Sequence, residues 1–397
     1  MATRQLKGLP DVRAFFHTNT EPLYFISPTP FNLLGIDRWV RNFYYLNYFD
    51  SFEGTHPRVF VPRKRDRRDF DSMGDVVNHL LSDPETLEFI ADRGPGGKAC
   101  FVMPDEETSG LARQAGLEVM EPPPELRHRL DSKVVMTRLA EEAGVPSVPH
   151  AIGRAGSYAE LLALASGAEL GDDLVVQDPY GNAGSGTFFL RGERDWDQCA
   201  AELTAQREVK VMKRIRNVEV CLEGAVTRYG TVVGPAMTSL VGYPELTPYR
   251  GSWCGNDVWR EALPPAQTRA AREMVRKLGD VLGRQGYLGY FEVDLLHDLD
   301  SDELYLGEVN PRLSGASPMT NLTTEAYADI PLFLFHLLEF MDVDYELDIE
   351  EINARWERGY GEDEVWGQVI ISETSTTAEI FTQTPRTGVY RLDAAGH

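Results

Sequence analysis

The sequence predicts a multidomain protein of α/β and α+β class. Within about the first 120 residues, short apolar runs alternate with longer polar ones, which is typical of parallel strands connected by helices. Further along, a glycine-rich loop joins two strand-like segments, and a later pair of strands carries acidic side chains. Because the chain has 397 residues, of which 42% are hydrophobic, there is room for two or three domains.

Composition favours a soluble cytoplasmic enzyme over other classes of protein. The net charge of −23 opposes nucleic-acid binding. No apolar run reaches the ~18–20 residues of a membrane span, and the first residues lack the apolar core of a signal peptide. The four cysteines are scattered without a CxxC pair, which predicts reduced thiols rather than a zinc or disulfide framework.

The first domain is expected to cover residues 1–121 as a small open α/β unit. A helix over Met73–Leu81 lies between its apolar runs. The basic cluster Arg63–Arg68 is interpreted as a solvated loop, and three consecutive prolines from Pro122 mark the boundary. The predicted buried strands are Tyr24–Ser27, Arg58–Val61, Ala99–Met103 and Glu118–Met120.

Three further units are expected, at 122–208, 209–342 and 343–397. The first begins with a helix over Asp131–Ala143, for which Asp131 is a good N-cap. The segment Gly242–Trp259 is expected to be irregular, and the last unit to hold an acidic helix and a strand. The other predicted elements are strands Leu174–Gln177 and Thr187–Leu190, a strand-rich stretch Val209–Leu240, and helices Ala266–Gly283 and Pro331–Met341.

A glycine-rich loop, Gly181–Gly186, offers several unhindered backbone N–H groups that can surround phosphate oxygens. No GK[ST] follows, so it is not a Walker loop. The chain returns directly to a strand, which also excludes the strand-to-helix turn of a Rossmann fingerprint. A flexible hairpin that closes over a nucleotide and a merely structural turn both remain open from this motif alone.

The stretch from Gly286 to Leu322 predicts a magnesium site. Period-2 alternation places Phe291, Val293 and Leu295 on one face of a strand, with Glu292 and Asp294 opposite. In the next strand, Leu306, Glu308 and Asn310 are expected to share a face. Carboxylate and amide oxygens are ligands that Mg²⁺ prefers. A calcium loop at Asp298 is excluded because Glu303 replaces the required glycine, whereas three exposed strand carboxylates remain an alternative.

Several cations and one aromatic segment complete the candidate residues. Lys133 lies in the first turn of a predicted helix, where the helix dipole makes a cation slightly unfavourable. We therefore expect its charge to interact with a group outside the helix. Arg312 suits a clamp on phosphoryl or carboxylate oxygens. Segment 242–257 mixes aromatic and ionic groups that suit an amphipathic small ligand such as an amino acid. Its candidate substrate residues are Glu245, Tyr249, Arg250 and Trp253.

Together, these motifs resemble the ATP-grasp superfamily over Asp131–Leu322. Four pieces occur in the family's order: DSK-x-x-M with its trailing AGVP; LVVQDPYGNAGSGTFFL; VKVMKRIRNVEV; and the acidic hairpin that ends in EVNPRLSG. The resemblance implies an ATP-grasp fold, in which two α+β subdomains hold ATP between them, preceded by an N-terminal pre-ATP-grasp domain. The implied cofactors are ATP and Mg²⁺, as two ions, with Mn²⁺ as an alternative.

The resemblance also implies roles for individual residues. Glu292 is a substitute for Asp294 as the first metal ligand, and Arg312 steadies the transferred phosphate or the acyl phosphate. The stretch SGASPMTNL, with Ser314 as a candidate substrate residue, suggests an amino-acid or peptide substrate. Implied metal ligands are Asp294, Glu308 and Asn310, the last two also catalytic. Implied nucleotide-binding residues are Lys133, Gln177, Gly181, Gly184, Ser185, Gly186, Lys210, Lys213 and Glu219.

One departure from the family concerns Gln177, where relatives usually carry a second phosphate-binding lysine. Loss of a charge-assisted contact costs on the order of 1–2 kcal/mol of phosphate binding. Lys210 or Lys213 could compensate from the strand that follows, a question that the sequence leaves open.

Three functions are carried forward from the sequence. The leading one is an ATP-dependent carboxylate–amine or carboxylate–thiol ligase that acts on small molecules through an acyl phosphate. The alternatives are a biotin carboxylase-like enzyme, against which Gln177 and the absence of an MKM tripeptide argue, and a nucleotide-binding protein without turnover. The oligomeric state stays open, with a homodimer as one expectation.

Overall fold

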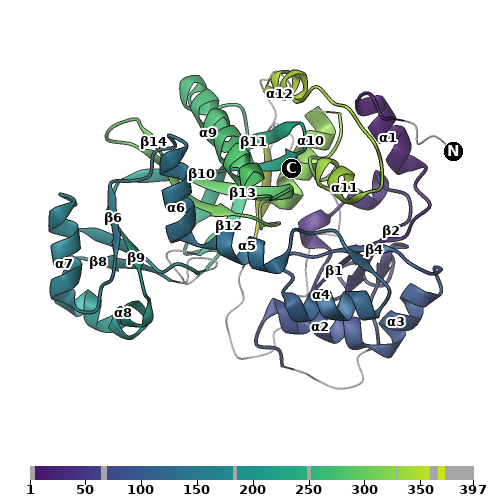
Figure 1. Ribbon diagram of the computed structural model, residues 1–397, viewed down its shortest axis with the longest axis horizontal. Helices are drawn as coiled ribbons and strands as arrows, with labels where there is room; N and C mark the ends of the chain where they lie inside the picture. The colour runs from purple at the N-terminus through teal and green to yellow at the C-terminus, as the bar shows by residue number, and fades with distance from the viewer. Residues whose placement is uncertain are drawn as a thin grey trace.

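The protein is described by a computed structural model that covers residues 5–63, 69–181, 186–247, 252–327, 329–357 and 365–371. Figure 1 shows three parts along the long axis. A small sheet with α7 (Tyr158–Gly167) and α8 (Glu193–Ala205) lies at one end. A larger sheet beneath α9 (Pro265–Arg284) lies in the middle, and the N-terminal sheet lies at the other end.

The N-terminal sheet contains five parallel strands in the order β3-β2-β1-β4-β5. One face packs against α2 (Met73–Ser82), α3 (Pro84–Ala91) and α4 (Glu106–Gln114) through an apolar cluster. The predicted open α/β domain is therefore present, and the helix over 73–81 is confirmed. The strands are β1 (Leu23–Ser27), β2 (Phe43–Asn47), β3 (Val59–Phe60), β4 (Lys98–Cys100) and β5 (Glu118–Val119).

Strand β2 was not predicted, although it lies inside the sheet between β1 and β3. Its sequence, FYYLN, is rich in the aromatic residues that strands favour. Asn42, which adopts a positive φ of 62°, precedes the strand, and Asn47 is its last residue. Because asparagine is a common turn former, only four strand-like residues remain between the two. Strands β3 and β4 are also shorter than expected.

The small sheet is antiparallel, in the order β6-β9-β7-β8. Helices α7 and α8 bury one of its faces in an apolar cluster. Because β9 pairs with β6 and β7, the expected unit boundary between residues 208 and 209 is wrong. The chain passes to the next sheet only between Lys213 and Asn217. The strands are β6 (His150–Gly153), β7 (Leu174–Gln177), β8 (Thr187–Leu190) and β9 (Val209–Lys213).

The large sheet has the order β14-β13-β10-β11-β12-β15, and all its pairs are antiparallel. Helix α9 buries its apolar stripe, including Ala271, Val275 and Leu278, against one face of this sheet. The opposite face carries polar side chains as well as apolar ones that pack against the last helices. The strands are β10 (Asn217–Thr227), β11 (Gly230–Val241), β12 (Trp253–Val258), β13 (Gly289–Asp298), β14 (Leu304–Asn310) and β15 (Trp366–Val369).

Two local predictions are wrong. Asp131 is not an N-cap, because it is the last residue of α5 (Pro124–Asp131), and Ser132 instead caps α6 (Lys133–Glu142) by accepting a hydrogen bond from the Val135 N–H. Within the segment expected to be irregular, β12 forms a strand that pairs with β11 and β15. Backbone pairing with a distant strand, rather than local propensity, determines this second case.

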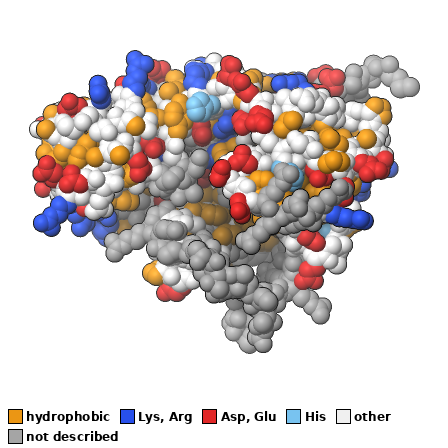
Figure 2. All heavy atoms as spheres, turned by 90° about the horizontal axis from the view of Figure 1, so that it is seen from below, with side chains coloured by type: hydrophobic (Ala, Val, Ile, Leu, Met, Phe, Trp, Pro, Cys, Tyr) orange, Lys and Arg blue, Asp and Glu red, His pale blue; other side chains and the backbone are white. Residues whose placement is uncertain are grey.

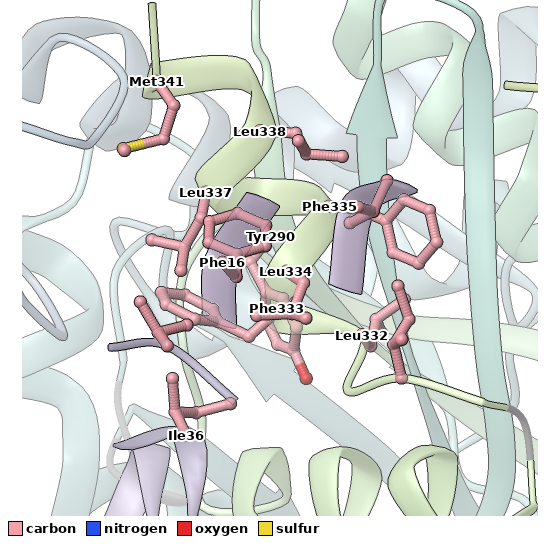
Figure 3. Packing of buried hydrophobic residues seen from close by; sticks show 14 of the residues in the cluster. Phe16, Ile36, Tyr290, Leu332, Phe333, Leu334, Phe335, Leu337, Leu338 and Met341 are labelled. Carbon is pink, nitrogen blue, oxygen red and sulfur yellow. The ribbon is translucent and has the colours of Figure 1, made fainter. Parts of the chain in front are cut away.

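The last helices join the N-terminal domain to the large sheet. They are α10 (Ser317–Tyr327), α11 (Phe333–Phe340) and α12 (Ile349–Glu357). Figure 3 shows side chains of α11, among them Phe333 and Leu337, beside Phe16 of α1 (Leu9–His17), Ile36 and Tyr290. This shared apolar core fixes the two domains against each other.

The described part of the chain has no helix that combines the length and the apolar character of a membrane span. All four cysteines are buried free thiols.

His336 is the polar link in this interdomain core. Its Nδ1 accepts a hydrogen bond from the Tyr290 N–H at 3.1 Å, and its Nε2 donates to the Met120 carbonyl at 2.8 Å. Burial lowers the pKa of His336 to about 4. The nearby Glu121 gives no compensating charge, because burial raises its pKa to about 8. The native state therefore holds this imidazole neutral.

We expect this link to make the protein unstable in acid. Between pH 6.5 and 4 the unfolded state binds a proton at residue 336 that the folded state does not, so the contribution of His336 to the free energy of unfolding falls as pH falls. The loss is on the order of 3 kcal/mol. Urea unfolding of the wild type and of His336→Gln over this range measures it as a difference in slope. Equal slopes would contradict the prediction.

Candidate active site

Four polar side chains converge where β13 and β14 pair. Glu292 lies opposite Asn310, and Asp294 lies opposite Glu308, so all four point away from α9. The Asn310 amide donates to Glu292 at 2.6 Å and lies 3.4 Å from oxygens of both Asp294 and Glu308. The carboxylates are therefore neighbours in one cluster rather than separate exposed groups, which rejects that alternative for the acidic hairpin.

The grouping of these four side chains depends on a β-bulge at Gly307. The register passes from Asp294↔Glu308 to Leu295↔Leu306, so Gly307 has no opposite residue. Leu306 consequently faces the apolar core beneath α9, whereas Glu308 faces the cluster. The expectation that Leu306 shares a face with Glu308 and Asn310 is wrong for this reason.

The cluster resists ionisation. Burial, followed by repulsion from Glu223, raises the pKa of Glu292 to about 8. Burial and then Glu292 raise the pKa of Asp294 well above its ordinary value. Burial, together with Glu308, raises the pKa of Glu219 to about 7. A cation placed among these oxygens would stabilise the ionised form of the carboxylates.

Lys133 connects this cluster to the glycine-rich loop. Its Nζ lies 3.0 Å from a Glu308 oxygen and donates to the Gly181 carbonyl at 2.7 Å. At the other end of the loop, the Gly186 carbonyl accepts from the Asp178 N–H at 2.9 Å. Gly186 has a φ of +75°, and a Cβ there would lie 2.4 Å from the Asp178 carboxylate. The hairpin therefore requires glycine at this position.

Arg312 holds the end of the cluster nearest α5. Its guanidinium donates to the Asn310 side-chain oxygen at 2.8 Å, and its Nε lies 3.8 Å from Asp131. This fixes the orientation of the Asn310 amide, whose nitrogen points to the carboxylates. One planar cation is thereby placed beside the acidic cluster, where it can meet an oxyanion.

Gln177 and Lys210 face each other across β7 and β9 on the sheet face not covered by α7 and α8. Both side chains are at least nine-tenths buried. The Gln177 Oε1 and the Lys210 Nζ each lack a hydrogen-bond partner among the described residues. Burial lowers the pKa of Lys210 to about 8, with Glu308 acting in the opposite direction.

Comparison with solved structures shows which fold the chain adopts. The biotin carboxylase domain dimer of Hydrogenobacter thermophilus 2-oxoglutarate carboxylase, with MgADP and bicarbonate, matches with a TM-score of 0.59 at 13% identity over 82% of this chain and 70% of that chain. Aspergillus clavatus carboxyaminoimidazole ribonucleotide synthase with ATP matches with a TM-score of 0.53 at 14% identity over 81% and 77%. The chain has the fold of the ATP-grasp superfamily.

Curated sequences agree with this ATP-grasp fold. The carbamoyl phosphate synthase large chain of Streptomyces griseus is 25% identical over 63% of this chain and 23% of its own length. The methylcrotonoyl-CoA carboxylase subunit alpha of Arabidopsis thaliana is 24% identical over 56% and 30%. The chain thus spans less than a third of the length of the curated relatives that it matches. No family model matches the sequence.

The structure places the remaining predicted residues in several different settings. Lys213 is exposed at the end of β9, and Glu245 is exposed in a turn. The Trp253 indole donates to Asn256 at 3.1 Å and covers Gly315 so closely that a Cβ there would lie 2.6 Å from its ring. Four predicted residues lie outside the described residues: Gly184, Ser185, Tyr249 and Arg250.

Ser314 belongs to a buried network that sequence reasoning missed. The centre of the network is Glu223, which accepts hydrogen bonds from Tyr290 at 2.6 Å, Ser317 at 2.7 Å and Ser314 at 3.0 Å. These partners come from β13 and from the segment that enters α10. The Ser314 hydroxyl is thus engaged in holding the turn after Arg312.

Cys221 was also missed as a neighbour of the acidic cluster. It lies opposite Asp294 on β10, and its Sγ is within 4.8 Å of oxygens of Glu292 and Asp294. The thiol accepts a hydrogen bond from Asn256 at 3.3 Å, and burial raises its pKa well above the ordinary value. The sequence contains no signal for this proximity, because the cysteine has no metal-binding spacing.

On the face of the molecule drawn in Figure 2, acidic and basic side chains are interspersed among the described residues. No extended basic patch is visible on that part of the surface.

The raised pKa values predict pH-dependent metal binding. Because protons must leave the cluster before a divalent cation binds, the affinity for Mn²⁺ should rise between pH 6 and pH 8, by up to about tenfold per unit for each proton displaced. Electron paramagnetic resonance of free Mn²⁺, without nucleotide, measures this. Glu292→Gln should weaken binding and flatten the profile, whereas the exposed Glu303→Gln should change neither. An affinity independent of pH would refute the prediction.

Proposed function

We propose that the chain is an ATP-dependent carboxylate–amine ligase that forms an amide or peptide bond through an acyl phosphate. The main observation in support is the cluster of Glu292, Asp294, Glu308 and Asn310, joined by Lys133 to the base of the glycine-rich loop. One constellation thus offers metal-ligating oxygens, a phosphate-side cation and a loop rich in backbone N–H groups. That combination suits Mg²⁺–ATP.

Magnesium would be held by Glu308 and Asn310, with Glu292 and Asp294 as the remaining oxygen donors. When bound, the metal supplies charge neutralisation of the phosphate oxygens. The neighbours solved with ATP or with MgADP support this assignment, because they share the fold. Lys133 would bind the phosphate side of the same nucleotide.

The chemistry requires positioning more than a protein nucleophile. A substrate carboxylate attacks the γ-phosphorus of ATP, ADP leaves, and the acyl phosphate forms. An amine then attacks the acyl carbon, and inorganic phosphate leaves. Arg312 would stabilise the negative charge that develops on the transferred oxygens, and closure of the loop would keep water from the acyl phosphate.

An amino acid or peptide is the proposed carboxylate substrate. Trp253 and the turn from Arg312 to Ala316 form an aromatic and polar wall next to the cluster. Glu223 keeps that turn in place through the hydroxyls of Ser314 and Ser317. Aromatic area with a few fixed polar groups is suited to a small zwitterion.

A biotin carboxylase-like reaction is the second candidate. The TM-scores of 0.59 and 0.58 to two biotin carboxylase structures favour it, and carboxyphosphate formation would use the same phosphate chemistry. A nucleotide-binding protein without turnover is less well supported, since binding alone does not need four metal-ligating groups in one cluster.

ADP release distinguishes these candidates. With Mg²⁺–ATP and amino acids added singly and in pairs, we expect turnover only for a particular pair. Glu308→Gln should reduce it on the order of 10²-fold or more, because the metal loses a charged ligand. Glu303→Gln, on the surface of the same hairpin, is the matched control. Turnover driven by bicarbonate alone would favour the carboxylase, and no turnover with intact ATP binding would favour the binder.

Arg312→Lys separates charge from geometry. The substitution keeps the positive charge but loses the planar fork and the contact with Asn310. We expect kcat to fall roughly 10- to 100-fold while the Kd for ATP changes by less than about threefold. Steady-state kinetics and calorimetry measure the two values. An equal change in both would mean that Arg312 contributes to nucleotide binding in the ground state.

A further inference from the structure

Resting on the proposed function, we infer that Lys210 and Gln177 together form a phosphate subsite, in which the positive charge comes from β9 instead of β7. The ligand class is a nucleoside di- or triphosphate, whose oxygens would accept hydrogen bonds from the Lys210 ammonium and the Gln177 amide. The subsite lies at the foot of the glycine-rich loop, four positions before Gly181 along the chain.

The register places the two side chains at one point. Gln177 and Lys210 are direct partners in an antiparallel pair, so their Cβ atoms lie within about 4.5–5.5 Å and on one face of the sheet. That face is opposite the apolar cluster beneath α7 and α8, which contains their neighbours Val176, Val209 and Val211. Both head groups are consequently directed away from the core of this sheet.

The unpartnered atoms indicate that a ligand is expected there. Lys210 is 0% exposed, yet its Nζ has no hydrogen-bond partner among the described residues. Taking an ammonium out of water without a partner is unfavourable, and a core position would be filled more stably by an apolar side chain. An anionic ligand that pairs with the ammonium would explain why Lys210 is buried without a partner.

The charges around Lys210 indicate which kind of anion. Lys133 lies close enough to Lys210 to disfavour the charged form of Lys210, whereas Glu308 favours it. Lys133 is held by Glu308 and Gly181. Two ammonium groups that converge beside metal-ligating carboxylates suit a polyanion that carries its own divalent cation.

The position of Lys210 on β9 also explains why residue 177 is a glutamine rather than a lysine. A lysine at both 177 and 210 would place two ammonium groups on directly opposed positions, where like charges destabilise a strand pair. One amide and one ammonium avoid this repulsion and still provide two donors. The Gln177 Nε2 lies 3.5 Å from the Thr187 hydroxyl on β8, and the amide nitrogen has a second N–H that can donate to a phosphate oxygen.

The test uses the chain of 397 residues and compares ligands with and without phosphates. Lys210→Met should weaken Mg²⁺–ADP at least tenfold by calorimetry, with adenosine, measured by competition, changed less than twofold. Arg207→Met, which removes an exposed cation just before β9, should change neither affinity. The exchanged variant Gln177→Lys/Lys210→Gln restores one charge to the same subsite and should recover most of the ADP affinity. Thermal unfolding of each variant verifies that it is folded.

The outcomes separate this inference from the proposed function. If wild-type protein binds no ADP, the proposed function fails. If it binds ADP and Lys210→Met binds equally well, the subsite alone is refuted. A parallel loss of ADP and adenosine affinity, or no recovery in the exchanged variant, would mean that Lys210 acts through the local structure, which also refutes the subsite. If Lys210→Met does not fold, Lys210→Gln with the same two ligands decides the question.

Discussion

The site depends on carboxylates buried in a sheet, which would repel one another without the donors and cations around them. Glu292, Asp294 and Glu308 share one face of β13 and β14 because of the strand register. The Asn310 amide lies between them, and Lys133 reaches Glu308 from α6. Burial raises the pKa values of Glu292 and Asp294, so the cluster favours the binding of a cation. The loop position and the orientation of Arg312 both follow from this arrangement.

The sequence predicted the acidic hairpin well because the relevant information is local. Period-2 alternation in the first strand and the short polar loop place the two acidic faces together. The ATP-grasp fold followed from the order of several motifs rather than from any one of them. The bulge at Gly307 could not be predicted in the same way, since an extra residue is defined only by the pairing of two strands. Leu306 was therefore assigned to the wrong face.

Residues with distant partners were the ones that the sequence concealed. Glu223 looks like an ordinary strand carboxylate, but its hydrogen-bond partners Tyr290 and Ser317 are 67 and 94 residues away. Cys221 has no motif, and only the register of β10 with β13 brings it to Asp294. Strand β12 likewise depends on β11 for its definition. In each case a non-local contact, which a single sequence does not display, determines the role.

The two kinds of charge in the site come from different parts of the fold. The carboxylates are on the six-stranded sheet, whereas Lys210 and Gln177 are on the four-stranded sheet, and the chain crosses between the sheets at residues 214–216. Lys133 lies between them and touches both Glu308 and the base of the loop. The anionic oxygens of a ligand could bind the donors of the four-stranded sheet, while a cation bound to that ligand pairs with the carboxylates of the six-stranded sheet. One ligand of this kind would therefore join the two sheets.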